Sequence, residues 1–158
     1  MRRFLIFLLL FVVVVGAAYW VTLRGSNQPL VDGSVIDGRF GGAPMRIELA
    51  LTEAAREKGL GGRTSLPSDS GMLFVFAKDD RYGFWMKDTL VPLDMFWLGD
   101  KGQVVYMALD VATSTYPNVF YPSVPARYVL ETAAGFGRAH GIATGTALVL
   151  KKFPRVSQ

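Results

Sequence analysis

The stretch "PMRIELALTEAAREKG" (residues 44–59) contains the clearest local pattern in the chain. In its first half, apolar side chains alternate with other residues at a period of two, which is typical of a strand with one buried face. Thr52 can then cap a short helix over residues 53–58. An acid lies in its first turn, a lysine in its last, and Gly59 fits the left-handed position beyond it. The stretch therefore predicts a half-buried strand followed by a short helix.

Short apolar stretches separated by turn residues continue toward the C-terminus. The predicted strands are "MLFVF" (72–76), "LDMFWL" (93–98), "QVVYMAL" (103–109), "ARYVLE" (126–131) and "TALVLKKF" (146–153). "GDKG" (99–102) has the signature of a hairpin, with Gly102 available for a positive φ, and a second short helix is expected around residues 135–140. Seven or eight short strands with two small helices predict a mainly β domain, an antiparallel sandwich or barrel-like fold.

Residues 1–24 differ in character from the rest of the chain. An uncharged apolar stretch covers residues 4–23, and at about 1.5 Å per residue it is long enough to cross a hydrocarbon core of about 30 Å. Bulky residues follow the small residues 16–18, so we predict an uncleaved transmembrane anchor. If it is instead a cleaved signal, the domain would be periplasmic or secreted. Arginines before the stretch outnumber the one after it, which places a single-pass protein in the inner membrane with its body outside the cytoplasm.

The predicted organisation is an anchor over residues 1–24, a short polar tether over 25–33 and one β domain over 34–158. Outside residues 1–24 the chain has 14 basic and 13 acidic residues, so its charge does not indicate a nucleic-acid surface. It has no cysteine, which excludes disulfides, thiolate nucleophiles and cysteine-bound metals. His140 is the single histidine and lies near a predicted helix end, where a structural role is expected. We predict neither a metal nor a cofactor.

The stretch "GFWMKDTLVPLDMFWL" (83–98) mixes large apolar side chains with charges. If residues 84–87 are extended, Phe84 and Met86 face one side, and Trp85 and Lys87 face the other. A tryptophan beside a lysine and the carboxylate of Asp94 could stack on a ligand ring while the charges hold its polar edge. The alternative is a Lys87–Asp94 ion pair under Trp85 that only holds the hairpin together.

Four blocks resemble, in order, the motifs of the DUF192 family, also called UPF0127. They are "EKGLGGRTSLPSDSGMLFVF" (57–76), "FWMKDTLVPLDM" (84–95), "PARYVLETAAG" (125–135) and "HGIATG" (140–145). The resemblance covers residues 45–150 and implies a compact mainly β fold with short helices, behind an N-terminal signal or anchor. It implies no particular activity. The family's recurrent positions match Arg63, Gly71, Trp85, Met86, Lys87, Pro92, Asp94, Arg127 and Glu131.

One position departs from the family pattern. The family most often has asparagine after the lysine, where this chain has Asp88. If that side chain contacts a ligand, an aspartate would alter the charge preference of the site. If it caps a turn, aspartate and asparagine are nearly interchangeable.

The first functional interpretation is a non-enzymatic binding module for a polar cell-envelope ligand, such as a saccharide, a peptide or a small metabolite. Trp85 would stack on the ligand, Lys87 and Arg63 would hold its anionic or hydroxyl groups, and Asp94 would orient the lysine. Tyr116 and Tyr121, on a proline-rich loop, would form a rim. The predicted ligand-binding residues are Arg63, Trp85, Lys87, Asp88, Asp94, Tyr121, Arg127 and Glu131.

The second interpretation is a hydrolase of envelope polymers with Asp94 and Glu131 as acid and base. Such chemistry needs carboxyl groups about 5–5.5 Å apart for retention or about 6.5–9.5 Å apart for inversion. Glu131 could instead pair with Arg127 or Arg63. Because the sequence contains no legible nucleophile–base pair, we assign no catalytic residue and prefer binding. A scaffolding role through surface apolar residues is a third alternative.

Overall fold

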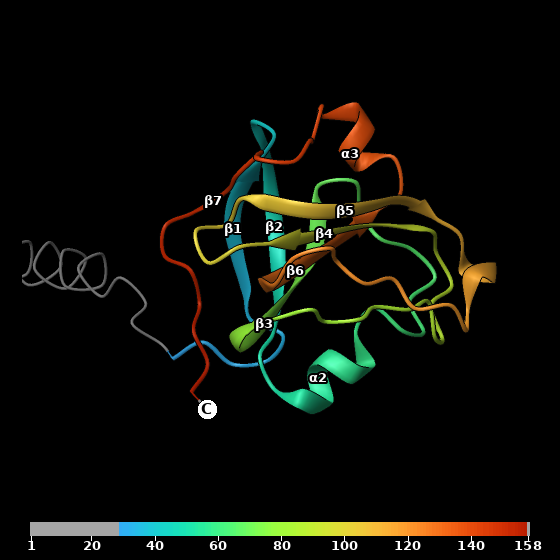
Figure 1. The fold of residues 1–158 in the computed structure, drawn as a ribbon, viewed down its shortest axis with the longest axis horizontal. Coiled ribbons are helices and arrows are strands. Elements are labelled where there is room, and N and C mark those ends of the chain that lie inside the picture. The colour runs from blue at the N-terminus through green and yellow to red at the C-terminus, as the bar shows by residue number, and fades with distance from the viewer. Residues whose placement is uncertain (1–28, 158) are drawn as a thin grey trace, which may run out of the picture.

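The computed structural model describes residues 29–157, which form one curled seven-stranded sheet with two short α-helices (Figure 1). The mainly β class predicted from the sequence is therefore confirmed. The strands are β1 (Val35–Phe40), β2 (Ala43–Ala50), β3 (Ser70–Asp80), β4 (Leu93–Leu98), β5 (Val104–Val111), β6 (Ala126–Ala133) and β7 (Leu148–Leu150). The helices are α2 (Glu53–Lys58), the 3-10 turn η1 (Thr113–Thr115) and α3 (Phe136–Ala139).

The predicted anchor over residues 4–23 lies outside the described residues. Within residues 29–157, no helix is both long enough and apolar enough to cross a membrane.

The strands follow the order β5-β4-β6-β3-β2-β1-β7 in a single sheet, which corrects the expectation of a purely antiparallel fold. β2 and β3 are parallel, whereas the other neighbours are antiparallel. The physical reason is the connection over residues 51–69, in which α2 returns the chain to the end of the sheet where β2 began.

The sheet curls into a half-barrel instead of forming the two layers of a sandwich. The backbone N–H of Val104, at the start of β5, donates to the carbonyl of Thr146, just before β7, at 2.9 Å. The N–H of Leu148 in turn donates to the carbonyl of Gly102 at 2.9 Å. The two outermost strands of the sheet therefore meet at one end.

Helix α2 forms as the sequence predicts. The Thr52 hydroxyl accepts a hydrogen bond from the backbone N–H of Ala55 at 3.2 Å, and Gly59 follows the helix with a φ of 48°. The carboxylate of Asp32 accepts from the backbone N–H of Thr52 at 3.0 Å and from its hydroxyl. These bonds fix the start of α2 beside the sheet.

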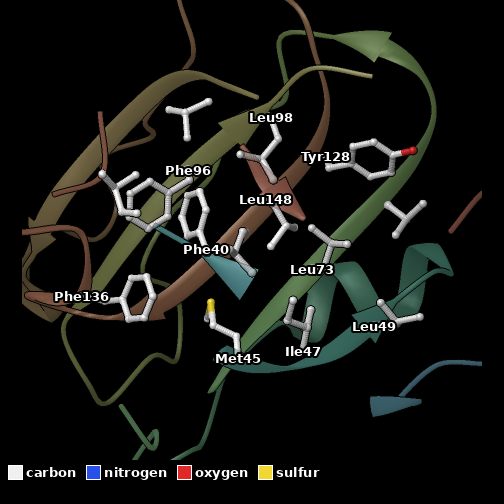
Figure 2. Packing of buried hydrophobic residues seen from close by; sticks show 14 residues of the cluster. Phe40, Met45, Ile47, Leu49, Leu73, Phe96, Leu98, Tyr128, Phe136 and Leu148 are labelled. Atoms are coloured by element: carbon white, nitrogen blue, oxygen red, sulfur yellow. The ribbon is translucent and has the colours of Figure 1, made fainter. Parts of the chain in front are cut away.

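Apolar side chains cover both faces of the sheet. Inside the curl, the inner core gathers side chains from both ends of the sheet (Figure 2), including Phe40, Met45, Ile47, Leu73, Phe96, Leu98, Tyr128, Leu130, Phe136 and Leu148. On the opposite face, the outer core includes Ala50, Leu60, Met72, Phe74, Phe84, Met86, Leu93, Met95, Trp97 and Val129. Because side chains alternate along a strand, the central strands contribute to both cores.

Two segments differ from the set of predicted strands. Residues 84–87 form no strand, and only Phe84 bridges to Phe120, through two backbone hydrogen bonds of 2.9 and 2.8 Å. The predicted alternation is nevertheless confirmed, because Phe84 and Met86 are buried whereas Trp85 and Lys87 are exposed. β1 is absent from the sequence prediction because polar residues and a glycine at 37–39 interrupt its apolar pattern.

Candidate ligand-binding groove

A groove of about 690 Å³ opens on the outer-core face of the sheet, between α2 and residues 82–89. This volume lies within the range of about 300–1,000 Å³ that is usual for small-molecule sites. Its lining residues are Glu53, Arg56, Glu57, Lys58, Gly59, Leu60, Phe74, Phe76, Ala77, Lys78, Tyr82, Gly83, Phe84, Trp85, Lys87, Thr89 and Glu131.

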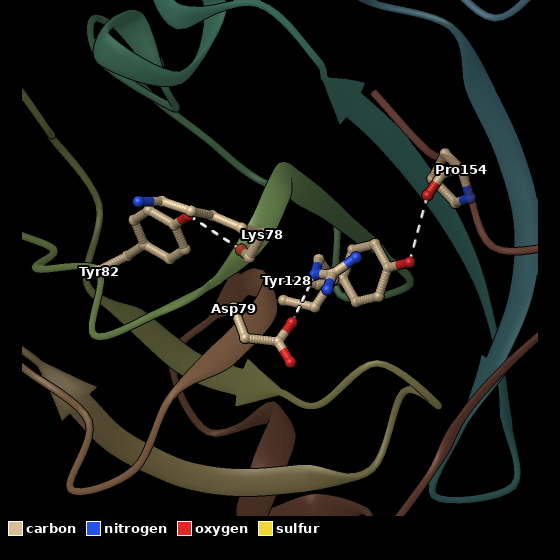
Figure 3. A network of polar contacts seen from close by, with 6 residues as sticks. Lys78, Asp79, Tyr82, Tyr128 and Pro154 are labelled. Carbon is tan, nitrogen blue, oxygen red and sulfur yellow. Dashed lines mark hydrogen bonds and ion pairs between the residues drawn. The ribbon is translucent and has the colours of Figure 1, made fainter. Parts of the chain in front are cut away.

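The walls of the groove are aromatic and held in place by their neighbours. Phe74 meets Phe84 edge to face, with ring centroids 4.8 Å apart, and Phe76 stacks on Tyr82. The Tyr82 hydroxyl donates to the carbonyl of Lys78 at 2.9 Å (Figure 3). The guanidinium of Arg56 lies 4.9 Å from the Phe76 ring centre. These contacts fix the walls before any ligand arrives.

Glu131 is the single acidic residue of β6, a mostly buried strand, and it lines the groove. It is 4% exposed, and its partners across the sheet are Met72 on β3 and Met95 on β4. Among the hydrogen bonds and ion pairs of residues 29–157, none involves its carboxyl group. Burial away from water raises the pKa of Glu131 to about 8. At neutral pH the group is therefore mainly a neutral acid, which can both donate and accept a hydrogen bond.

Exposed charged and aromatic side chains share the groove lining with this acid. Trp85 is 51% exposed and, like Lys58 and Lys87, lines the groove. The ion pairs of the described chain involve neither Lys58 nor Lys87. Both ammonium groups are therefore available to a bound molecule.

Asp94 does not join Trp85 and Lys87, which corrects the expected three-residue unit. It lies on the inner-core face, fully buried, and accepts hydrogen bonds from the backbone N–H of Asp110 at 2.7 Å and of Gly137 at 2.8 Å. The segment that carries Trp85 covers the other face of β4. Asp94 thus ties β5 and α3 to the sheet and does not orient the lysine.

Asp94 and Glu131 also lie on opposite faces of the sheet. Asp94 pairs across the sheet with Thr132, whereas Glu131 pairs with Met95. Paired residues point to the same face and successive residues to opposite faces. The two carboxyl groups therefore do not form the shared acid–base site that the hydrolase interpretation requires.

The remaining predicted basic residues have partners outside the groove lining. One terminal nitrogen of the Arg63 guanidinium donates to both carboxylate oxygens of Glu48 at 2.8 Å. Arg127 pairs with Asp79, which is labelled in Figure 3. The sequence left open whether Glu131 pairs with one of these arginines, and the structure shows that it pairs with neither.

Asp88 forms a turn, and the predicted tyrosines lie outside the groove lining. Asp88 has a φ of 55°, and its carbonyl accepts from the backbone N–H of Gly62 at 2.8 Å. Aspartate and asparagine both tolerate this left-handed conformation, which supports the turn interpretation of this position. Tyr121 is exposed and lies against Gly83. Tyr116 is exposed on its loop.

Of the predicted ligand-binding residues, the structure brings Trp85, Lys87 and Glu131 to the groove. The aromatic walls and the place of Lys58 in the groove are not predicted by the sequence, where Lys58 indicates only a charge at the end of a helix. A signal for the walls exists in β3, where Phe74 and Phe76 alternate with Leu73 and Val75.

Comparisons with known proteins agree with this architecture. The profile of the DUF192 family, described as "Uncharacterized ACR", matches residues 36–150. A crystal structure of a protein from Sinorhizobium meliloti 1021, described as a proposed transcription regulator, is 29% identical with a TM-score of 0.71. The matched region covers 76% of this chain and 96% of the Sinorhizobium meliloti chain. A protein of unknown function from Novosphingobium aromaticivorans DSM 12444 is also 29% identical, with a TM-score of 0.64 and coverage of 78% and 93%. A search of curated proteins found no match. The chain belongs to the DUF192 family.

Proposed function

We propose that the domain is a non-enzymatic binding module whose groove takes one small ligand with a flat or apolar body and polar ends. The observation that carries this proposal is Glu131, which is 4% exposed and lines a groove with fixed aromatic walls, and whose carboxyl group forms no hydrogen bond or ion pair with residues 29–157. A polar group at the wall of such a groove takes its partner from the groove itself, as water or as a polar group of a ligand.

The ligand classes follow from the lining. Aromatic walls favour a molecule with at least one apolar face, which a saccharide ring, a peptide side chain or an aromatic metabolite can present. Trp85 would cover the bound molecule, and Lys58 and Lys87 would contact its outer polar groups. No catalytic role is proposed for this groove.

Binding can be measured with benzamide, a flat ring bearing a neutral polar group. We expect saturable binding to the full-length chain in mild detergent, measured by saturation-transfer NMR. Trp85→Ala should weaken it by about 3–10-fold, because stacking on an aromatic ring contributes about 0.5–1.5 kcal/mol. Leu90→Ala is the matched control, since Leu90 is similarly exposed on the same segment but lies outside the groove lining. Equal effects of the two substitutions would show that benzamide does not bind in the groove.

We also propose that residues 4–23 tether this module to the inner membrane with residues 26–158 outside the cytoplasm. Support comes from the length of the apolar stretch and the arginines that precede it. Protease added to spheroplasts should then digest the domain. Protection of the domain, or recovery of soluble protein lacking residues 1–18, would contradict the tether.

A further inference from the structure

The surroundings of Glu131 restrict the chemistry of the ligand group that can contact its carboxyl. Its neighbours across the sheet, Met72 and Met95, offer no strong hydrogen-bonding group. Arg56, the arginine of the groove lining, already donates to the carbonyls of Leu51 and Val75. The described part of the chain therefore supplies neither a counter-ion nor a hydrogen-bond partner to this carboxyl.

A carboxyl in such surroundings is more easily kept neutral than charged. A neutral carboxylic acid presents a donor and an acceptor side by side. The group that satisfies both at once is an acceptor and a donor at the same spacing, as in a primary carboxamide or a lactam. A lone ammonium group would instead bind the ionised form of the carboxyl. The lysines of the groove lining would also repel it.

We propose that Glu131 recognises an amide edge of the ligand, a carboxamide or lactam that forms two hydrogen bonds with the carboxyl group. The aromatic walls then hold the ring or chain that carries the amide, and an anionic tail of the ligand can contact Lys58 and Lys87, the exposed lysines of the groove lining. This inference rests on the proposed binding function and adds the chemical class of the ligand.

Four probes with the same ring separate the possibilities: benzamide, benzoate, benzylamine and benzyl alcohol. At pH 6.5, we expect benzamide to bind the full-length chain at least about 5-fold more tightly than each of the other three. Tighter binding of benzylamine, lost in Glu131→Gln, would show that Glu131 acts as a charged carboxylate and would overturn the proposal. Saturable binding of none of the four would instead overturn the proposed binding function itself.

Two substitutions of Glu131 provide the decisive comparison. Glu131→Leu fills the same space without hydrogen bonds and should weaken benzamide binding by about 10-fold or more. Glu131→Gln keeps a donor and an acceptor and should keep the affinity within about 3-fold of the wild type. Thermal melts confirm that both variants fold. If benzamide binds Glu131→Leu as tightly as the wild type, the groove binds ligands but Glu131 does not select them.

The pH profile gives an independent measurement. Wild-type affinity for benzamide should fall by about 5–10-fold between pH 7 and pH 9, because the ionised carboxylate no longer donates, given its pKa of about 8. The other titratable or charged groups that line the groove are Glu53, Arg56, Glu57, Lys58, Lys78, Tyr82 and Lys87. Any pH dependence of affinity caused by these groups should also be present in Glu131→Gln. If Glu131 causes the fall in affinity, the affinity of Glu131→Gln for benzamide should stay constant between pH 7 and pH 9. Matching profiles for the two proteins would overturn the assignment.

Discussion

Raising the pH from 4 to 9 should lower the free energy of unfolding by about 4–5 kcal/mol through Glu131 alone. Burial raises its pKa in the folded domain to about 8, from an ordinary value of 4.5. A carboxyl whose pKa is raised by folding contributes its full stabilisation at a pH below its pKa in the unfolded chain. This stabilisation is lost as the pH rises through its pKa in the folded domain. At about 1.36 kcal/mol per pKa unit, the loss reaches about 5 kcal/mol above pH 8.

Denaturant unfolding of the wild type and of Glu131→Gln at pH 4, 6, 8 and 9 measures this effect. The difference between the two proteins removes the contributions of all other titrating groups. We expect the wild type to lose stability relative to the variant across this range, most steeply between pH 5 and 8. Glu131→Leu should abolish the same pH dependence. Parallel curves for all three proteins would mean that Glu131 ionises at the same pH whether the domain is folded or unfolded.

Replacing Asp94 by alanine should destabilise the domain by about 3–5 kcal/mol. The substitution leaves two backbone N–H groups, the buried one of Gly137 and the partly buried one of Asp110, without their carboxylate acceptor. Hydrogen bonds to charged groups contribute about 1.5–3 kcal/mol each, and an unsatisfied buried donor costs about 1–3 kcal/mol. Asp94→Asn retains one acceptor oxygen and should lose less. Urea unfolding monitored by circular dichroism provides the measurement.

Lys87→Met is the informative control for Asp94. Lys87 is exposed and has no ion pair within the described chain, so its removal should cost less than about 1 kcal/mol. A loss of unfolding free energy as large as that of Asp94→Ala would indicate an ion pair between Lys87 and Asp94, which the structure does not show. Benzamide titration of the same Lys87 variant reports separately on the groove.

Local signals in the sequence predicted those parts of the fold that depend on neighbouring residues. Helix α2 was predicted with its bounds because Thr52, an acid in the first turn and Gly59 all act within a few residues. The hairpin at residues 99–102 was predicted for the same reason, and Gly102 has the expected positive φ of 82°. The parallel pairing of β2 with β3 was not predicted, because it depends on the end of the sheet to which the connection over residues 51–69 returns the chain.

The groove was only partly predictable because it forms between distant segments. Every residue of β4 is buried, so its pattern does not indicate which face meets the segment carrying Trp85 and Lys87. This is why Asp94 was assigned to the wrong face. The approach of α2 to residues 82–89 likewise depends on the packing of the outer core, which has no local signature.

The strand order sets the sequence in which the sheet can be completed during synthesis. β6 lies between β3 and β4, although it follows both of them in the chain. The β4–β5 hairpin and the β1–β2–β3 unit are therefore not joined in one sheet until residues 126–133 pair with both β3 and β4. Pairings between residues far apart in sequence form slowly, which leaves apolar strand edges open in the meantime. Because β6 also carries Glu131, the strand that joins the two halves brings the groove its acid, so an incompletely folded chain lacks the binding site.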